Sequence, residues 1–247
     1  MIDLSEEATW PNDLLTLLEE TSQRTSQEKL PELKAHKEGS DIWRSLKTIV
    51  FDNTKAKIEQ IITSLEIRAF HCTRLKVLES VRSEGLVALN PKTAKERVLS
   101  ALVGAGVNGH LLHTASDALD AFELSGQYEN RTGSVWFVLT KEMTDDHGCE
   151  DLLKYFGGEA TRRALWHIRD TLYPVLETIG TPAVVECEVS IADGADFQIS
   201  HIAEEFIRYG HRKYIDGEKY SMFCEIFVPH SIDSNKILDV WEKNLIA

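Results

Sequence analysis

Residues 70–86 combine residue types that bind polar ligands with a change from a strand pattern to a helix pattern. The residues before His71 are apolar and extended in character, and the apolar residues after Thr73 recur three apart, as on one face of a helix. We expect Thr73 to cap that helix and Gly85 to end it in a left-handed turn. Arg74 then falls in the first turn, where backbone N–H groups attract anions. This pattern indicates a phosphate-binding site.

Two later strand patterns carry residues that we expect to share a cleft with His71. These residues are Trp136 and Glu225, and the carboxylate is the more informative because a half-buried carboxylate needs a partner. Each of the three also has an ordinary structural interpretation: a hydrogen-bonded core histidine, a core tryptophan, and the exposed face of an antiparallel strand. Glu186 and Glu188, on the preceding strand pattern, compete with Glu225 for the same role.

The order of these motifs resembles that of the ADP-ribosyltransferase superfamily, and the branch with a His–Tyr–Glu constellation is the most similar. In that branch a strand ending in His leads into a helix that closes near Gly-Leu, as His71-Cys72-Thr73 and Gly85-Leu86 do here. Val135-Trp136-Phe137 is similar to the second strand of the family. Glu225-Ile226-Phe227-Val228-Pro229 is similar to its late acidic strand. The resemblance covers residues 67–240.

Two departures from the family pattern concern the cleft. The aromatic residue is Trp136 where the family has Tyr, and residues 87–132 form a long helical insertion between the first two motifs. Both departures affect which acceptor the cleft would take and how the residues of the cleft would be arranged.

The resemblance implies that NAD⁺ is the substrate. Cleavage of the bond between ribose and nicotinamide passes through an oxocarbenium-like state, which a carboxylate at Glu225 would stabilise. His71 and Thr73 would hydrogen-bond the bound NAD⁺, and Arg74 would meet its pyrophosphate with a planar guanidinium. Trp136 would stack on the nicotinamide, for about 1 kcal/mol.

We therefore expect a mono-ADP-ribosyltransferase, such as a bacterial toxin or defence enzyme, that modifies a protein or nucleic acid and releases nicotinamide. The net charge of −13, from 27 basic and 40 acidic residues, argues against broad binding to nucleic acid and favours a protein acceptor. A nucleic-acid acceptor stays open because of local basic residues, namely Arg162, Arg163, Arg208, Arg212 and Lys213.

Two alternatives remain at the level of sequence. One is a non-catalytic binding or immunity module on the same fold, which predicts no turnover of NAD⁺ and tolerance of substitution at Glu225. The other is an RNA 2′-phosphotransferase relative, which needs more basic residues around the cleft than Arg74 and Arg82 provide.

The composition, 43% apolar and 27% charged, is typical of a globular protein. We find neither a leader pattern nor an apolar run of membrane-spanning length, so we expect a cytoplasmic protein without a membrane partner. No two cysteines have the short spacing of a zinc site, which predicts reduced thiols and no metal. The cysteines are Cys72, Cys149, Cys187 and Cys224.

Strand and helix patterns alternate irregularly, which indicates an α+β fold. The resemblance specifies an ADP-ribosyltransferase-like split, mostly antiparallel sheet with surrounding helices. We expect an N-terminal helical segment at 1–66 and the ADP-ribosyltransferase-like domain at 67–247. Expected helices include 41–65, the stretch from Asn90-Pro91 to Ala101, 116–124, 200–209 and a terminal helix at 240–245. Expected later strands are 134–140, 183–191, 219–228 and 232–237.

Overall fold

The structure, a computed structural model, describes residues 1–29, 31, 35, 53–129 and 131–244. The chain divides into two compact units, and each is described by itself. Unit 1 contains Met1–Arg68 and Val189–Ile226, and unit 2 contains Ala69–Glu188 and Phe227–Ala247. The expected boundary at residue 66 lies close to the first break. The return of the chain through Val189–Ile226 into unit 1 was not expected.

The sheet has five strands in the order β4-β2-β1-β3-β5. β1 pairs antiparallel with β2, with Phe70 opposite Val138, and β3 pairs antiparallel with β5. An antiparallel sheet with separate helices confirms the predicted α+β class. The strands are β1 (Glu66–Leu75), β2 (Val135–Val138), β3 (Thr181–Ser190), β4 (Glu225–Val228) and β5 (Ile237–Glu242).

The helices agree with the sequence pattern in the middle of the chain. Residues 53–62 are helical, so the end of the helix expected at 41–65 is present, whereas residues 41–52 lie outside the described part. The labelled helices are α1 (Asn12–Arg24), α4 (Leu78–Glu84), α5 (Pro91–Gly104), α6 (Gly109–Leu124), α7 (His147–Lys154), α8 (Gly158–Ala164), α9 (Arg169–Thr178) and α10 (Asp196–His211).

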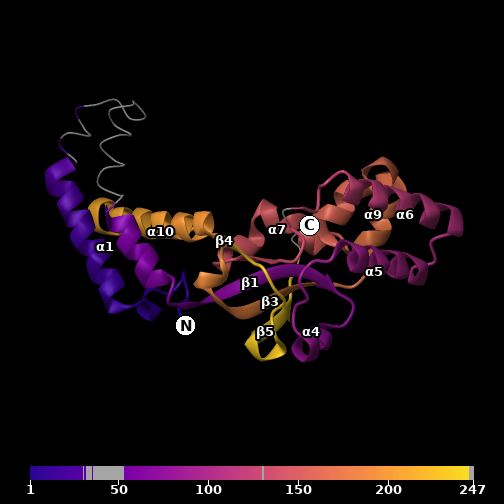
Figure 1. Cartoon of the computed structure of the whole chain (residues 1–247), viewed down its shortest axis with the longest axis horizontal. Helices are drawn as coiled ribbons and strands as arrows, with labels where there is room; N and C mark the ends of the chain where they lie inside the picture. The colour runs from indigo at the N-terminus through magenta and orange to yellow at the C-terminus, as the bar shows by residue number, and fades with distance from the viewer. Residues whose placement is uncertain (30, 32–34, 36–52, 130, 245–247) are drawn as a thin grey trace. The chain divides into compact units, whose positions relative to one another are not determined.

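Unit 1 is built on the contact between α1 and α10 (Figure 1). Leu14 and Leu18 are fully buried on α1, four residues apart and so on one helix face. Trp10, just before α1, packs edge-on against Phe206 and Tyr209 of α10, with ring centroids 4.8 and 4.7 Å away. These contacts fix the N-terminal segment to α10.

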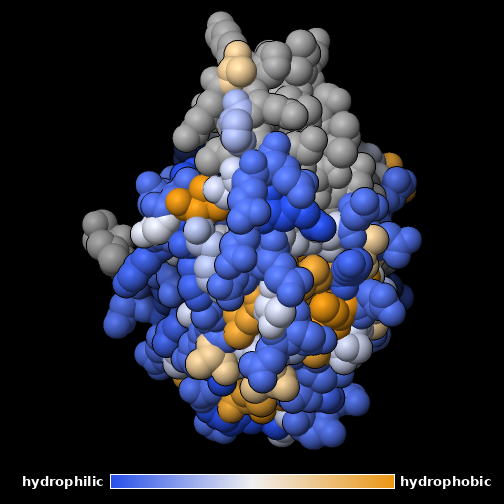
Figure 2. Space-filling view, turned by 90° about the vertical axis from the view of Figure 1, so that its left-hand side faces the viewer, coloured by the Kyte–Doolittle hydropathy of each residue, from blue (hydrophilic) through white to orange (hydrophobic). Residues whose placement is uncertain are grey.

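Figure 2 shows a largely hydrophilic face with small groups of hydrophobic residues.

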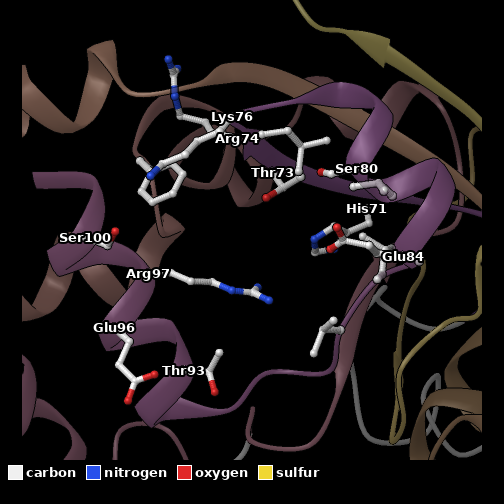
Figure 3. A pocket seen from close by; sticks show the side chains of 16 residues that line it. His71, Thr73, Arg74, Lys76, Ser80, Glu84, Thr93, Glu96, Arg97 and Ser100 are labelled. Carbon is white, nitrogen blue, oxygen red and sulfur yellow. The ribbon is translucent and has the colours of Figure 1, made fainter. Parts of the chain in front are cut away.

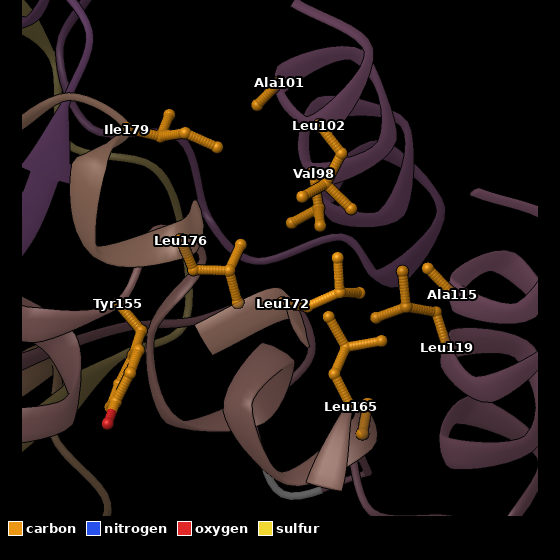
Figure 4. Close-up of a cluster of buried hydrophobic side chains, with 11 residues drawn as sticks. Val98, Ala101, Leu102, Ala115, Leu119, Tyr155, Leu165, Leu172, Leu176 and Ile179 are labelled. Atoms are coloured by element: carbon orange, nitrogen blue, oxygen red, sulfur yellow. The ribbon is translucent and has the colours of Figure 1, made fainter. Parts of the chain in front are cut away.

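Unit 2 has a helical core made by α5, α6, α8 and α9 (Figure 4). Asn90 caps α5 by accepting a hydrogen bond from the Thr93 N–H at 3.0 Å, and Pro91 occupies the first turn. Val98, Ala101 and Leu102 of α5 are buried in this core. One side of α5 is thereby committed to packing, which leaves its other side for the surface.

The last part of the chain differs from the prediction. The expected terminal helix at 240–245 was wrong, because Ile237–Glu242 forms strand β5 with Val240 opposite Val185. Only Glu225–Val228 of the strand expected at 219–228 is regular. Of the strand expected at 232–237, Ile232 forms an isolated bridge with Leu86 and Ile237 begins β5. Pairing with β3 decides the conformation of β5, and a local sequence pattern does not contain that information.

Candidate functional site

A pocket of about 550 Å³ lies in unit 2, between the end of β1, α4 and one side of α5 (Figure 3). It is lined by His71, Thr73 and Arg74, three of the four residues expected to bind NAD⁺. Phe156, between α7 and α8, lines it as well. This volume lies within the usual range for small-ligand sites.

The strand β1 presents alternate residues to the pocket and to a buried cluster. Phe70 and Cys72 belong to a hydrophobic core, whereas His71 and Thr73 lie on the other face because successive side chains of a strand alternate. The expected cap at Thr73 was wrong, since β1 continues to Leu75 and α4 begins only at Leu78. Thr73 therefore reaches the pocket from a strand.

His71 has a fixed orientation. Its Nδ1 lies 2.8 Å from the Trp136 carbonyl oxygen, and because a carbonyl only accepts, Nδ1 carries the hydrogen. Nε2 then has no proton and can accept a hydrogen bond, and His71 lines the pocket. Burial lowers the pKa of His71, and the hydrogen bond to Trp136 partly opposes this effect. The imidazole is therefore neutral near pH 7.

The Trp136 side chain has a different environment from the one expected. Its indole packs on the buried cluster that contains Phe70 and Val138, and the pocket contacts above do not include it. Trp136 contacts His71 through its backbone carbonyl, which accepts the hydrogen bond from Nδ1. Stacking of its ring on nicotinamide stays a prediction, and this packing gives it no support.

Arg74 lies in β1, so its expected place in the first turn of a helix was wrong. The residue is 9% exposed, and its guanidinium donates to backbone carbonyls at the C-terminal ends of α7 and α9, where unpaired carbonyls favour a cation. The distances range from 2.7 to 3.3 Å, to the carbonyl oxygens of Leu153, Lys154, Glu177, Ile179 and Gly180. Its contact with a phosphate stays a prediction, although these bonds occupy its donors.

The helix α4 ends at the pocket. Gly85 has φ +78°, a region that favours glycine, and a Cβ there would lie 2.1 Å from the Ile232 carbonyl oxygen. The helix therefore ends at Gly85 with a positive φ, as predicted, but its ψ of −167° lies outside the left-handed helical region that we expected. Leu86 forms an antiparallel bridge with Ile232, which fixes the chain after the helix. Glu84, the last residue of α4, lines the pocket beside this turn.

The structure adds residues that the sequence pattern did not single out. Thr93, Arg97 and Ser100 of α5 line the pocket, and their spacing of four and three places them on one helix face. Lys76, after β1, also lines it and has its Nζ 5.6 Å from the centre of the Phe156 ring. The sequence did contain a signal for Arg97, because the polar residues Thr93, Arg97 and Ser100 recur at helical spacing between the apolar residues of α5.

The predicted carboxylates lie on strands. Glu225 is the first residue of β4, is exposed and belongs to unit 1, so its sharing of a cleft with His71 and Trp136 stays a prediction. Glu188 on β3 forms an ion pair with Lys236. Glu186, also on β3, is half-buried. None of these three is in the pocket lining that the described part of the chain provides.

No family model, curated protein or solved structure matches this chain. The four cysteines are free and buried. In the described part of the chain, no helix is long and apolar enough to span a membrane. Among the same residues, no group of His, Cys, Asp or Glu has an arrangement that would hold a metal. The His71 pocket is therefore the candidate functional site.

Proposed function

We propose that this protein is a NAD-dependent mono-ADP-ribosyltransferase that binds NAD⁺ in the His71 pocket, transfers ADP-ribose to a protein or nucleic acid, and releases nicotinamide. The observation that carries this proposal is the tautomer of His71, which leaves an acceptor nitrogen facing a pocket of nucleotide size. An acceptor of this kind binds a ribose hydroxyl. The ADP-ribosyltransferase-like split of the sheet is part of the same proposal.

The mixed charge of the pocket supports NAD⁺ in particular. The ligand carries two phosphate charges and a cationic nicotinamide. The pocket offers the cations Lys76 and Arg97 as well as the carboxylates Glu84 and Glu96. The ring of Phe156 adds a flat apolar surface for a base.

The proposed reaction is a substitution at C1′ of the nicotinamide-linked ribose. The C1′–N bond breaks and its electron pair stays with nicotinamide, which leaves neutral. The acceptor forms a new bond to C1′ and loses a proton. A carboxylate next to the ribose stabilises the positive charge in between. Glu225 remains our candidate for this role, with Glu186 and Glu188 as alternatives.

A non-catalytic binding module is the second candidate. It is favoured because none of the three candidate carboxylates, Glu186, Glu188 and Glu225, is among the described residues that line the pocket. Such a module binds NAD⁺ without breaking it. An RNA 2′-phosphotransferase relative would instead require a 2′-phosphorylated RNA for turnover.

The test measures the melting temperature with increasing NAD⁺ and, separately, nicotinamide release with a mixture of candidate acceptors and with water alone. Binding at 100 times the dissociation constant stabilises the fold by about 2.7 kcal/mol, which a melting curve detects. We expect both signals in the parent protein. Substitution of His71→Ala should remove most of the stabilisation, and His113→Ala, on the exposed side of α6, is the matched control.

The outcomes separate the candidates. Stabilisation by NAD⁺ with nicotinamide release supports the transferase. Stabilisation without release supports the binding module. Absence of stabilisation in the parent protein contradicts both.

A further inference from the structure

We propose that Arg97 forms an anion-binding subsite of the pocket, which takes the phosphate group of a phosphorylated ligand. The sequence motifs assigned this role to Arg74, whose guanidinium donates to five backbone carbonyls. This subsite lies in the pocket that we propose for NAD⁺, but phosphate binding there does not require the transfer reaction. The α5 side of the pocket would bind the phosphate part of the ligand.

The helix α5 packs with one side in the helical core of unit 2. Val98, Ala101 and Leu102 are buried there (Figure 4). Arg97 and Thr93, four residues apart on the same helix, line the pocket. In Figure 3 the Arg97 side chain extends from α5 into the middle of the pocket, toward the side where His71 and Glu84 lie.

Arg97 differs from two other cations of unit 2, which form ion pairs. Lys95 pairs with Asp120 at 2.5 Å and Arg131 pairs with Glu159 at 2.7 Å. Among the residues that the structure describes, no hydrogen bond or ion pair engages the guanidinium of Arg97. A planar guanidinium that is free at a pocket centre matches two oxygens of a phosphate.

In the part of the chain that the structure describes, neither Glu84 nor Glu96 forms an ion pair with this guanidinium. Glu96 is the adjacent residue of α5, and Figure 3 shows its carboxylate directed away from Arg97 and toward Thr93. Glu84 comes from α4, on the His71 side. A ligand between these sides therefore has its phosphate at Arg97 and a hydroxyl-bearing or cationic group toward His71 and Glu84. Thr93 and Ser100 of α5 also line the pocket.

The test compares the affinity of the full chain for inorganic pyrophosphate, ADP-ribose and NAD⁺ by titration calorimetry. Arg97→Gln removes the charge, Arg97→Lys keeps it without the planar fork, and Lys92→Gln removes a charge from the exposed first turn of the same helix. We expect Arg97→Gln to weaken pyrophosphate and ADP-ribose binding at least about tenfold. Arg97→Lys should be intermediate, and Lys92→Gln should stay within about twofold of the parent. Melting curves check that each variant folds.

Equal affinity of Arg97→Gln and parent for pyrophosphate overturns the subsite, as does absence of pyrophosphate binding to the parent at millimolar concentration. If the parent binds pyrophosphate through Arg97 but does not bind NAD⁺, the subsite stands and the proposed function fails. If NAD⁺ binds and turns over equally well in parent and Arg97→Gln, the proposed function stands and the subsite fails.

Discussion

The Nδ1 atom of His71 lies 2.8 Å from the carbonyl oxygen of Trp136 on the adjacent strand β2. This bond sets the ring orientation and the tautomer at once, because the carbonyl requires a donor at Nδ1. The remaining nitrogen, Nε2, then faces the pocket as an acceptor. The sequence predicted separate ligand contacts for His71 and Trp136. In the structure the two residues contact each other, His71 through its side chain and Trp136 through its backbone carbonyl.

The lowered pKa of His71 predicts a pH dependence of binding and stability. Because burial disfavours the charged ring, the unfolded chain binds a proton near the ordinary pKa of about 6.5 while the folded protein does not. The free energy of unfolding therefore falls as the pH drops below about 6.5, and is unaffected by this group above it. Affinity for NAD⁺ should fall at still lower pH, once Nε2 gains a proton.

The measurement is urea unfolding of the parent and of His71→Gln from pH 8 to pH 5. Gln keeps a donor for the Trp136 carbonyl and does not titrate. The variant should lose less stability than the parent over the acidic half of this range. Identical curves for the two proteins would contradict the assignment of a neutral, buried imidazole.

Arg74 should prove a structural residue. Arg74→Met leaves several buried carbonyls without a donor, so we expect a loss of about 3 to 5 kcal/mol in the free energy of unfolding. The control is Arg82→Met, which removes an exposed ion pair with Asp239 and should cost about 1 kcal/mol or less. Denaturant unfolding compares them. If Arg74→Met is as stable as Arg82→Met, the carbonyl contacts do not stabilise the fold.

The buried carboxylate of Glu205 should hold the segment that leads into β4. It is 1% exposed and accepts hydrogen bonds from the Tyr220 hydroxyl at 2.9 Å and the Phe223 N–H at 3.1 Å. Arg208 pairs with it at 2.5 Å. Because Glu205→Leu removes the shared acceptor of these donors, we expect a loss of about 3 kcal/mol in the free energy of unfolding.

The neighbouring residue on α10 provides the control for Glu205. Glu204 is more exposed and pairs with Lys55 at 2.6 Å, so Glu204→Gln should cost about 1 kcal/mol or less. Thermal or urea unfolding of both variants distinguishes the two positions. Similar costs at both would show that the contacts of Glu205 with Tyr220 and Phe223 add little.

The catalytic carboxylate is tested by charge removal. Glu225→Gln keeps size and hydrogen bonding but removes the negative charge, so we expect a folded protein that binds NAD⁺ and releases nicotinamide about a hundredfold more slowly. Glu186→Gln and Glu188→Gln are controls on β3, and the second also loses its ion pair with Lys236. Glu84→Gln tests the carboxylate that lines the pocket. Parent-like turnover in Glu225→Gln would exclude that residue, and an inactive control would identify the carboxylate instead.

Local signals in the sequence were sufficient for much of the fold. Asn90-Pro91 predicted the start of α5, because a capping side chain and a proline act within one turn. The β-branched and aromatic stretches gave β2 and most of β3, and Gly85 marked the end of α4. His71 lines a pocket, as its motif led us to expect. These features depend on residues a few positions apart, which a sequence pattern contains.

Tertiary structure decided the features that depend on distant partners. The strand β1 continues through Arg74, whose side chain donates to carbonyls at helix ends more than 70 residues away in the sequence. Ile237–Glu242 forms a strand because β3 supplies the hydrogen bonds that its sequence cannot specify. Arg97 could be assigned to the pocket lining only from the packing of α5 in the tertiary structure. Sheet pairing and helix packing join segments far apart in the chain, and this is the information that a linear pattern lacks.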